Sequence, residues 1–346
     1  MTNSGCTYID ELKRSSVTGQ AHDSAAVDRR TCRNSEVEAG KWSPRSRRRN
    51  VERQLYRQAL AALIIPTAGS LVAVMVACQT GVGLMEISLL AVMFVLTCLG
   101  ISVAFHRHLT HKSFKAKPIL RALMIIFGCM AAEGPPIYWA AVHRHHHAHS
   151  DDGEDPHSPY RFGSGTRNLM RGLWYAHVGW MLDHPVIKVS FYVRDLLEDS
   201  LVRTINNWYY VWILLGLSLP AAIGWVITGT TLGGLKGFLW GGMVRIFLLH
   251  HFTWSVNSVC HVLGKRPFST GDGSANNGWL AIPTLGESWH NNHHAFPYSA
   301  IFGLRPTEID IGGWAVRLLE ACRLAWDVKV PAPAAIARRR QHNDLH

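Results

Sequence analysis

The sequence predicts an all-α integral membrane protein with four transmembrane helices and a helical cap on their cytoplasmic side. Three observations lead to this fold class. Long apolar blocks alternate with polar stretches, basic residues concentrate before the first apolar block, and histidines gather in the polar stretches. The chain has 346 residues, of which 48% are hydrophobic, and this is enough for one large domain or two small ones.

Four apolar blocks define the predicted transmembrane helices. They are residues 59–78, 87–105, 208–231 and 237–253. The first three carry no charge and reach the roughly 18 to 20 residues that a helix needs to cross the hydrocarbon layer. The fourth contains Arg245 and is the weakest. We expect one hairpin that turns near residues 79–81 and a second that is joined across residues 229–236.

A fifth apolar segment, residues 119–139, differs from these four. Glu133 and the pair Pro135-Pro136 interrupt it, and proline inside a helix removes a hydrogen bond and bends or ends the helix. We therefore expect this segment to lie at the membrane surface or inside the protein rather than to span the bilayer.

The net charge of +11 is concentrated toward the two ends of the chain. Ten basic residues lie between Arg29 and Arg57, and Arg338, Arg339 and Arg340 lie near the C-terminus. Basic residues beside a transmembrane helix mark its cytoplasmic end. We therefore expect both termini in the cytoplasm, and the charge predicts a membrane protein without a nucleic-acid partner.

This pattern divides the chain into three parts. Residues 1–50 are typical of a disordered basic tail, residues 51–330 form the membrane domain, and residues 331–346 form a basic C-terminal tail. The seven cysteines include no C-x-x-C pair, so no disulfide framework, zinc ribbon or iron–sulfur site is predicted. The polar first fifty residues predict no cleavable signal peptide.

The positions of the histidines support four crossings independently of hydropathy. Of the 20 histidines, 17 lie between residues 106 and 294. If the N-terminus is cytoplasmic, four crossings return both long polar regions, which begin at residues 106 and 255, to the cytoplasm. Three or five crossings would leave at least one histidine cluster on the opposite side.

Nine of these histidines and one asparagine have the spacing of metal ligands. Two triplets have the spacing i, i+3, i+4, namely His143, His146 and His147, and His290, His293 and His294. Asn257 and His261 form a further pair with the spacing i, i+4. Side chains at this spacing share one face of a helix, so each triplet can converge on one point.

The remaining two of the nine, His106 and His111, are five residues apart. In an α-helix they would lie about 140° apart, so either they hold two sides of a shared centre or the helix ends between them. Nine imidazoles and an amide suit two ions with four or five ligands each. The cap is therefore expected to hold a histidine-ligated dimetal centre, and iron, zinc, copper and nickel all fit nitrogen ligands.

The other histidines of this region have different expected roles. His108 and His145 lie on the opposite helix face from the proposed ligands, so they are expected to support ligands or to face the surface. Four more, His149, His157, His177 and His184, are expected to orient ligands through hydrogen bonds. His250 and His251 are expected to cap the fourth transmembrane helix or to meet the membrane interface.

The stretches "HRHLTH", "HRHHHAH", "NSVCH" and "ESWHNNHH", interleaved with the apolar blocks, resemble the membrane fatty acid desaturases of the stearoyl-CoA desaturase type. The resemblance covers residues 59 to about 305. It implies two iron ions, with O₂ as co-substrate, that remove two hydrogens from neighbouring saturated carbons. The implied ligands are His106, His111, His143, His146, His147, Asn257, His261, His290, His293 and His294.

The resemblance also has implications for partners and substrate. The chain has no haem-binding, Rossmann or ferredoxin motif, so a separate electron donor of the ferredoxin or cytochrome b5 type, with a reductase, is implied. Trp139 and Thr253 match residues at the bend of the family's substrate tunnel, and Trp180 of "HVGW" is also expected to contact the substrate.

Two departures from the family pattern concern the carrier of the acyl chain. An Arg-Asp pair of the animal enzymes is replaced by Ala141-Val142, and a basic pair after "HVGW" is missing where this chain has Asp183. These changes weaken the expectation of a CoA thioester and leave acyl carrier protein, a membrane lipid or a small metabolite open. A hydroxylase with the same dimetal core is the nearest alternative, and a histidine-rich metal transporter is the alternative from another class.

Overall fold

The computed structural model describes residues 44–183 and 187–341. Most of the N-terminal tail expected over residues 1–50 and one expected orienting residue, His184, lie outside this part. Residues 44–50 are helical, because helix α3 begins at Pro44 and continues without a break into the first apolar block. Proline is well suited to the first position of a helix, where no backbone donor is lost.

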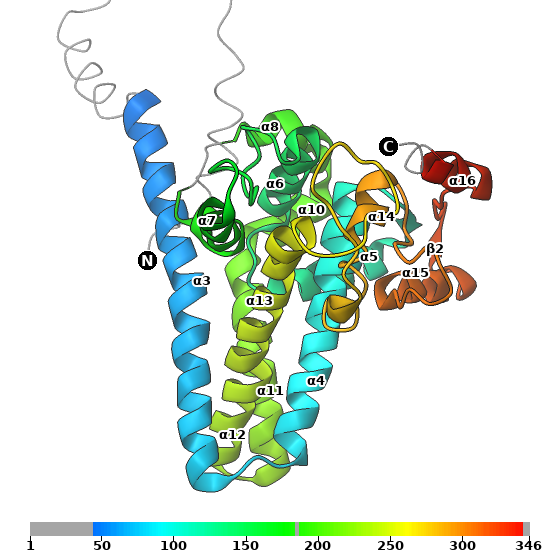
Figure 1. Ribbon diagram of the computed structural model, residues 1–346. Coiled ribbons are helices and arrows are strands. Elements are labelled where there is room, and N and C mark those ends of the chain that lie inside the picture. The colour runs from blue at the N-terminus through cyan, green and yellow to red at the C-terminus, as the bar shows by residue number, and fades with distance from the viewer. Residues whose placement is uncertain (1–43, 184–186, 342–346) are drawn as a thin grey trace, which may run out of the picture.

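Among the described residues, four helices are long and apolar enough to cross a membrane, as predicted. They are α3 (Pro44–Thr80), α4 (Leu84–Leu99) continued by the π-helix η1 (Gly100–Thr110), α11 (Tyr209–Thr228), and α12 (Thr231–Gly237) continued by η3 (Phe238–Val244), α13 (Arg245–Ser258) and η4 (Val259–His261). Figure 1 shows that they reach one common lower end, with the cap above them.

The second hairpin is tighter than expected. Only Gly229 and Thr230 join α11 to α12, whereas a connection over residues 229–236 was predicted. Gly229 adopts a left-handed conformation with φ of 67°, and the side chain of Thr230 accepts the Gly233 N–H to cap α12. These two residues therefore reverse the chain alone.

The fourth transmembrane helix is longer than its apolar block, which ends at residue 253. It continues to His261, so His250 and His251 lie within α13 rather than at its end, contrary to the expectation. The upper part of the helix is enclosed by the cap instead of ending at the interface. His250 and Ser258 are therefore buried there, and Thr253 and Asn257 are partly buried.

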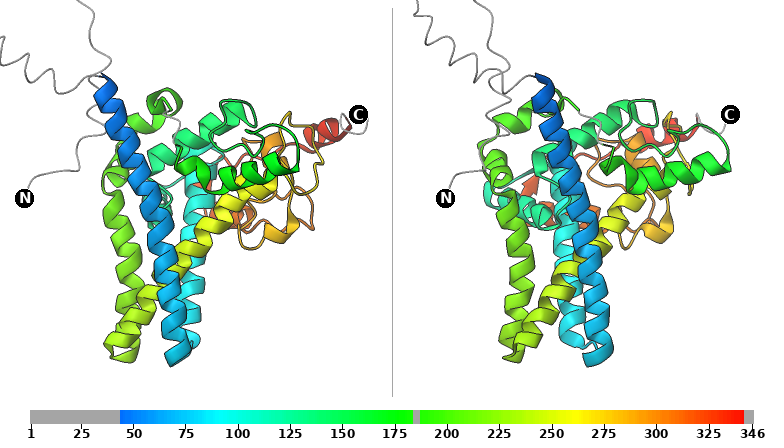
Figure 2. Two further views of the ribbon diagram at one scale, coloured as in Figure 1. Left: turned by 60° about the vertical axis from the view of Figure 1, so that its left-hand side comes forward. Right: turned by 90° about the vertical axis from the view of Figure 1, so that its left-hand side faces the viewer.

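The cap is formed by helices from the two long polar regions. These are α5 (Pro118–Met130), α6 (Pro136–His149), α7 (Thr166–His177), η2 (Gly179–Met181), α8 (Val189–Tyr192), α9 (Arg194–Glu198), α10 (Ser200–Asn207), η5 (Gly278–Leu280), α14 (His290–Ala295), α15 (Ile311–Ala321) and α16 (Pro333–Gln341). Strands β1 (Lys115–Ala116) and β2 (Ala325–Trp326) pair antiparallel and join the two regions. Figure 2 shows both regions at the same end of the bundle.

Helix α5 belongs to the segment that was predicted not to span. It has 13 residues and packs against η1, α4 and α11. Its approach to η1 is close, because a Cβ added to Gly100 would lie 2.1 Å from the backbone nitrogen of Gly128. The buried Arg245 holds the end of α5 by donating hydrogen bonds to the carbonyls of Met130 (2.6 Å) and Gly216 (3.1 Å).

Candidate metal centre and adjoining cavity

The π-helix η1 places His106 and His111 on one side. The His111 N–H donates to the carbonyl of His106 at 3.1 Å, which is an i→i−5 hydrogen bond. Residues five apart therefore lie nearly above one another, and the two ring centroids are 4.9 Å apart. The expected separation of about 140° holds only for an α-helix, so it does not apply here.

Nine histidines gather into two groups whose ring nitrogens lie within 4.8 Å of one another. The first group is His106, His111, His143, His147 and His293, and the second is His146, His261, His290 and His294. These are the nine histidines that were singled out by spacing. They come from η1 and the residue after it, from α6, from η4 and from α14, which are far apart in the sequence.

Each triplet is divided between the two groups, so its three rings do not converge on one point, although their spacing allows it. His143 and His147 belong to the first group, while His146 belongs to the second. On an α-helix, residue i+4 lies about 40° from residue i, whereas i+3 lies about 60° away in the other direction. A helix that faces the gap between two groups therefore sends the i, i+4 pair to one group and i+3 to the other. In the second triplet, in α14, His290 and His294 belong to the second group and His293 belongs to the first.

In the first group, ring nitrogens face one another. The Nε2 atom of His293 lies 3.0 Å from that of His106 and 2.8 Å from that of His147, and His147 lies 3.1 Å from His143. The Nδ1–H of His106 donates to the carboxylate of Glu287. The Nε2 atom of His106 therefore carries a lone pair directed at its neighbours.

The second group has the same arrangement. The Nε2 atom of His290 lies 3.0 Å from that of His261 and 3.1 Å from that of His294. His261 donates its Nδ1–H to Asp151 at 2.8 Å, and His294 donates to Asp272 at 2.7 Å. Both rings therefore direct a lone pair toward His290, which has at most one proton to share between them.

A cation fits this donor set. The Nδ1–H of His146 donates to Asp155 at 3.0 Å, and its Nε2 atom, like that of His111, is buried without a hydrogen-bond partner among the described residues. Lone pairs that converge at about 3 Å in a buried space repel each other unless a positive ion lies between them. The two groups are therefore suited to one metal ion each.

The protonation states of most of these rings agree with this reading, whereas Asp155 and its neighbouring carboxylates outweigh burial and raise the pKa of His146. Burial and then the neighbouring imidazoles lower the pKa well below its ordinary value for five rings, those of His111, His143, His147, His290 and His293. These rings are neutral near pH 7, which is the form that binds metal. Burial alone would raise the pKa of Glu287, but its contacts with His106 and Arg107 outweigh burial and lower the pKa to about 2.

The carboxylates that orient the rings were not predicted from the spacing of the histidines. They are Asp151, Asp155, Asp272 and Glu287. Three of them lie within nine residues of a histidine triplet in the chain, and Asp272 lies 18 residues before His290. Metal-binding histidines regularly donate their second N–H to a carboxylate, so acidic residues beside a histidine motif were the available signal.

The remaining histidines lie outside the two groups. His108 bonds to the Phe114 carbonyl, and His145 to the Tyr192 hydroxyl and the Glu154 carbonyl. His157 lies beside His146 with 4.3 Å between ring centroids and a tilt of 33°, but its Nδ1 atom has no hydrogen-bond partner among the described residues, so it does not orient a ligand through a hydrogen bond as expected. His177 bonds to Ser258 and to His251, and His250 bonds to the Ala131 carbonyl.

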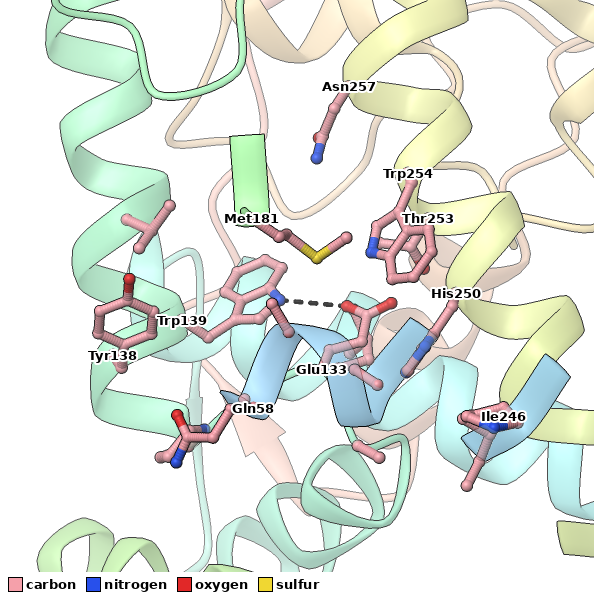
Figure 3. A pocket seen from close by; sticks show the side chains of 18 of the residues that line it. Gln58, Glu133, Tyr138, Trp139, Met181, Ile246, His250, Thr253, Trp254 and Asn257 are labelled. Atoms are coloured by element: carbon pink, nitrogen blue, oxygen red, sulfur yellow. Dashed lines mark hydrogen bonds between the residues drawn. The ribbon is translucent and has the colours of Figure 1, made fainter. Parts of the chain in front are cut away.

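A cavity of about 340 Å³ adjoins the two groups. It extends from His106, His143 and His290 to the wall formed by α3. The three residues expected to contact a substrate, Trp139, Thr253 and Trp180, all line it, and so does Asn257. Figure 3 shows Asn257, Thr253 and Trp139 around this space, with a hydrogen bond from Trp139 to Glu133.

Comparison with known proteins points to one family. A family model described as fatty acid desaturase matches residues 86–308. Hex-5-enoyl-(acyl-carrier protein) acetylenase of Moorena producens (strain JHB) is 42% identical over 279 residues, which cover 80% of this chain and 87% of the relative.

Two further relatives are named by lipid substrates. The sn-1 stearoyl-lipid 9-desaturase of Anabaena variabilis is 37% identical over 67% of this chain and 79% of the relative. The chloroplastic palmitoyl-monogalactosyldiacylglycerol delta-7 desaturase of Arabidopsis thaliana is 40% identical over 68% of this chain and 60% of the relative.

Proposed function

Because this chain belongs to the fatty acid desaturase family, we propose that it is an O₂-dependent desaturase that introduces a double bond into a saturated carbon chain at a di-iron centre. It is an oxidoreductase, as its relatives are by name. The observation that carries the proposal is the pair of histidine groups whose lone pairs converge beside a cavity.

The proposed ligands of one iron ion are His106, His111, His143, His147 and His293, and those of the other are His146, His261, His290 and His294, with Asn257 completing the coordination. When bound, the iron pair supplies the activation of O₂ that removes two hydrogens from neighbouring carbons. The carboxylates of Asp155 and Glu287 hold the protons of His146 and His106 on Nδ1. They keep each Nε2 atom free to bind.

The cavity residues position the substrate. Trp139 from α6 and Thr253 from α13 face the same part of the cavity, and Trp180 lines it near the histidines. A chain held between them presents one carbon pair to the metal centre and excludes water from it. Such positioning contributes a large part of the barrier reduction in reactions of this kind.

The proposal favours an acyl-lipid or an acyl-carrier-protein substrate over a CoA thioester. Ala141 and Val142 are uncharged, and Asp183 is acidic and pairs with Arg161 at 3.3 Å. These positions offer no cation for the phosphates of CoA. Relatives of this chain are named for acyl-carrier-protein, acyl-lipid and acyl-CoA substrates alike, so the preference rests on these positions alone.

Electrons would come from a separate donor of the ferredoxin or cytochrome b5 type, since the sequence holds no motif for a redox cofactor of its own besides the histidines. We also propose that the cap and both termini lie in the cytoplasm, because basic residues precede the first transmembrane helix.

Product analysis tests the proposed reaction. The protein is expressed in a host of defined lipid profile, with the His146→Ala variant as an inactive control, and products are identified by untargeted mass spectrometry. A desaturase yields a product that has lost two hydrogen atoms. A product that has gained an oxygen atom instead would show the alternative, a di-iron hydroxylase.

A further inference from the structure

A basic surface lies at the edge of the cap, beside the second histidine group. It is formed by the loop after η4, residues 262–277, by the chain after α14, residues 296–310, and by α16. Its exposed cations are Lys265, Arg266, Arg305, Arg338 and Arg339. None of them is among the proposed metal ligands or lines the cavity.

A small apolar core joins the three segments of this basic surface. The ring of Phe268, from the loop, lies against that of Phe296, which follows α14, with 5.3 Å between the centroids. Leu304 and residues of α16 pack on this pair. The guanidinium of Arg339 lies 5.2 Å from the centroid of the Phe296 ring, and that of Arg340 lies 5.6 Å from the centroid of the Phe268 ring. The segments therefore form one continuous surface.

Two cations of the basic surface lie close to a proposed metal ligand. Arg339 donates to the carbonyl of Ala295, the residue after His294. Arg266 donates to the carbonyl of Asp272, whose carboxylate accepts the Nδ1–H of His294 at 2.7 Å. Both contacts lead from exposed side chains to the same buried ring. Because electron transfer slows steeply with distance, a redox protein bound here would be well placed to reduce the metal centre.

The charge of the basic surface is not neutralised by its own segments. Their acidic side chains face inward, since those of Asp272, Glu308 and Asp310 are 7%, 8% and 1% exposed. Lys265 and Arg338 form no ion pair within residues 44–183 and 187–341. An exposed patch of one sign attracts and orients a partner of the opposite sign. The surface is therefore suited to an acidic partner.

The position of α16 favours a soluble partner over anionic lipid. Figure 1 shows α16 farther than α15 from the lower ends of the transmembrane helices. Helix α15 exposes Trp314 and Leu318, at 58% and 65%, and such side chains are suited to the membrane interface. With α15 nearer the membrane, the cations of α16 lie on the side of the cap that is open to soluble proteins.

We propose that the basic surface is the docking site of the electron donor, and that this donor is a small acidic protein that carries one electron at a time. The inference rests on the proposed function, because desaturation with O₂ needs electrons from outside. Removal of two hydrogens from the acyl chain supplies two electrons and two protons, whereas reduction of O₂ to two water molecules takes four of each. The donor therefore docks twice in each cycle, and water supplies the other two protons.

Binding tests the docking site without turnover. The iron-loaded full-length protein, in phosphatidylcholine nanodiscs, is titrated with a plant-type 2Fe–2S ferredoxin and, separately, with the soluble domain of a cytochrome b5, both acidic one-electron carriers. We expect at least one of them to bind, with an affinity that falls as salt is added. Lys265→Glu combined with Arg338→Glu should weaken this binding at least about tenfold.

Electron delivery gives a second measurement. Stopped-flow absorbance without substrate should show that the same double variant slows reduction of the bound iron by the carrier. Reduction by photoreduced deazaflavin, a small molecule that needs no docking site, should be unchanged. Arg167→Glu combined with Lys188→Glu is the matched control, because both residues are exposed in another part of the cap and the change in net charge is equal. This control should keep wild-type binding.

Three outcomes would overturn the docking site: no binding of either carrier, equal weakening in the control and test variants, or unchanged affinity in the test variant. Carrier binding that disappears when phosphatidylglycerol is added to the nanodiscs would assign the surface to lipid headgroups instead. If the test variant loses iron or melts earlier, Lys265→Gln combined with Arg338→Gln decides the question. Carrier binding at this surface in a protein that forms no unsaturated product would contradict the proposed reaction and keep the docking site.

Discussion

Each ring that donates its Nδ1–H to a carboxylate has an Nε2 atom ready for metal, and this pairing is the chemical basis of the proposed centre. The outer carboxylates are largely buried, as Asp155 at 2% exposure illustrates. A buried carboxylate beside a buried imidazole fixes both the ring orientation and the tautomer. Metal affinity should therefore depend on residues that never touch the ion.

Removing one ring should empty the centre without preventing insertion into the membrane. We expect His146→Ala to lose bound iron and all activity, because the second group would keep only three imidazoles. His108→Ala is the matched comparison, since His108 bonds to the Phe114 carbonyl outside both groups and should keep substantial activity. Iron content by elemental analysis checks both variants. Equal iron loss in the two would contradict the ligand assignment.

Removing an outer carboxylate should weaken the centre in a graded way. Asp155→Asn keeps the size of the side chain but loses the charge that faces His146, so iron affinity should fall about 10- to 100-fold. Competition with a chelator measures the affinity. Asp152→Asn is the control, because Asp152 is exposed and contacts His149. Unchanged iron retention in Asp155→Asn would show that the pairing does not support the metal.

At the scale of elements, the centre depends on how helices end and cross. The π-helical turns of η1 bring His106 and His111 together, and α6 is locked beside that end of η1 by Arg144. Arg144 donates to the carbonyl of Leu109 at 2.6 Å and to Asp195 of α9 at 2.6 Å. One guanidinium group thus ties together three elements whose relative positions set the geometry of the first histidine group.

The ion pair of Asp195 should give stability that depends on pH. Burial alone would raise the pKa of Asp195, but Arg144 and Lys112 outweigh it and lower the pKa from 3.8 to about 2. The pair therefore stabilises the fold fully above pH 3.8, and its contribution is lost as the pH falls toward 2. Asp195→Asn should lower stability at neutral pH by on the order of 1 kcal/mol.

Melting temperatures of the solubilised protein across this pH range check the prediction. The difference between wild type and Asp195→Asn should shrink as the pH falls from about 4 to about 2. Asp183→Asn is the control, because its pair with Arg161 is exposed and should contribute little at any pH. A constant difference across the range would mean that Asp195 acts through packing rather than charge.

At the scale of the whole molecule, both polar regions meet at one end of the four-helix bundle (Figure 1). The two histidine groups combine residues from both regions, so they can form only if the number of crossings between the regions is even. The hairpin ends, near Thr80 and Gly229, lie at the other end. Assembly of the proposed metal centre therefore requires that both polar regions lie on the same side of the membrane.

Labelling with a membrane-impermeant thiol reagent tests this topology. Cys322 is exposed in the cap, and Thr80→Cys would place a thiol at the opposite end. With Cys6, Cys32 and Cys78 replaced by serine, we expect Cys322 to react only from the cytoplasmic side and Thr80→Cys only from outside. Reversed labelling would overturn the proposed orientation, and labelling of both sites from one side would overturn the four-crossing topology.

The sequence by itself determined the four transmembrane helices, the segment that does not span and the nine histidines that gather. Apolar length and residue spacing are local properties, because the hydrophobicity of each segment determines whether that segment spans the membrane. Glu133 was visible only as an interruption of an apolar segment, and the Asp and Glu partners of the histidines were not singled out.

Only the tertiary structure decided how each histidine triplet divides, which carboxylate faces which ring, and where the carboxyl group of Glu133 lies. The partners of His106 and His261 are 181 and 110 residues away in the chain. The π-helical form of η1 likewise accompanies packing against α5 and α6. Contacts between distant segments depend on the packing of the whole chain, so no local pattern specifies them.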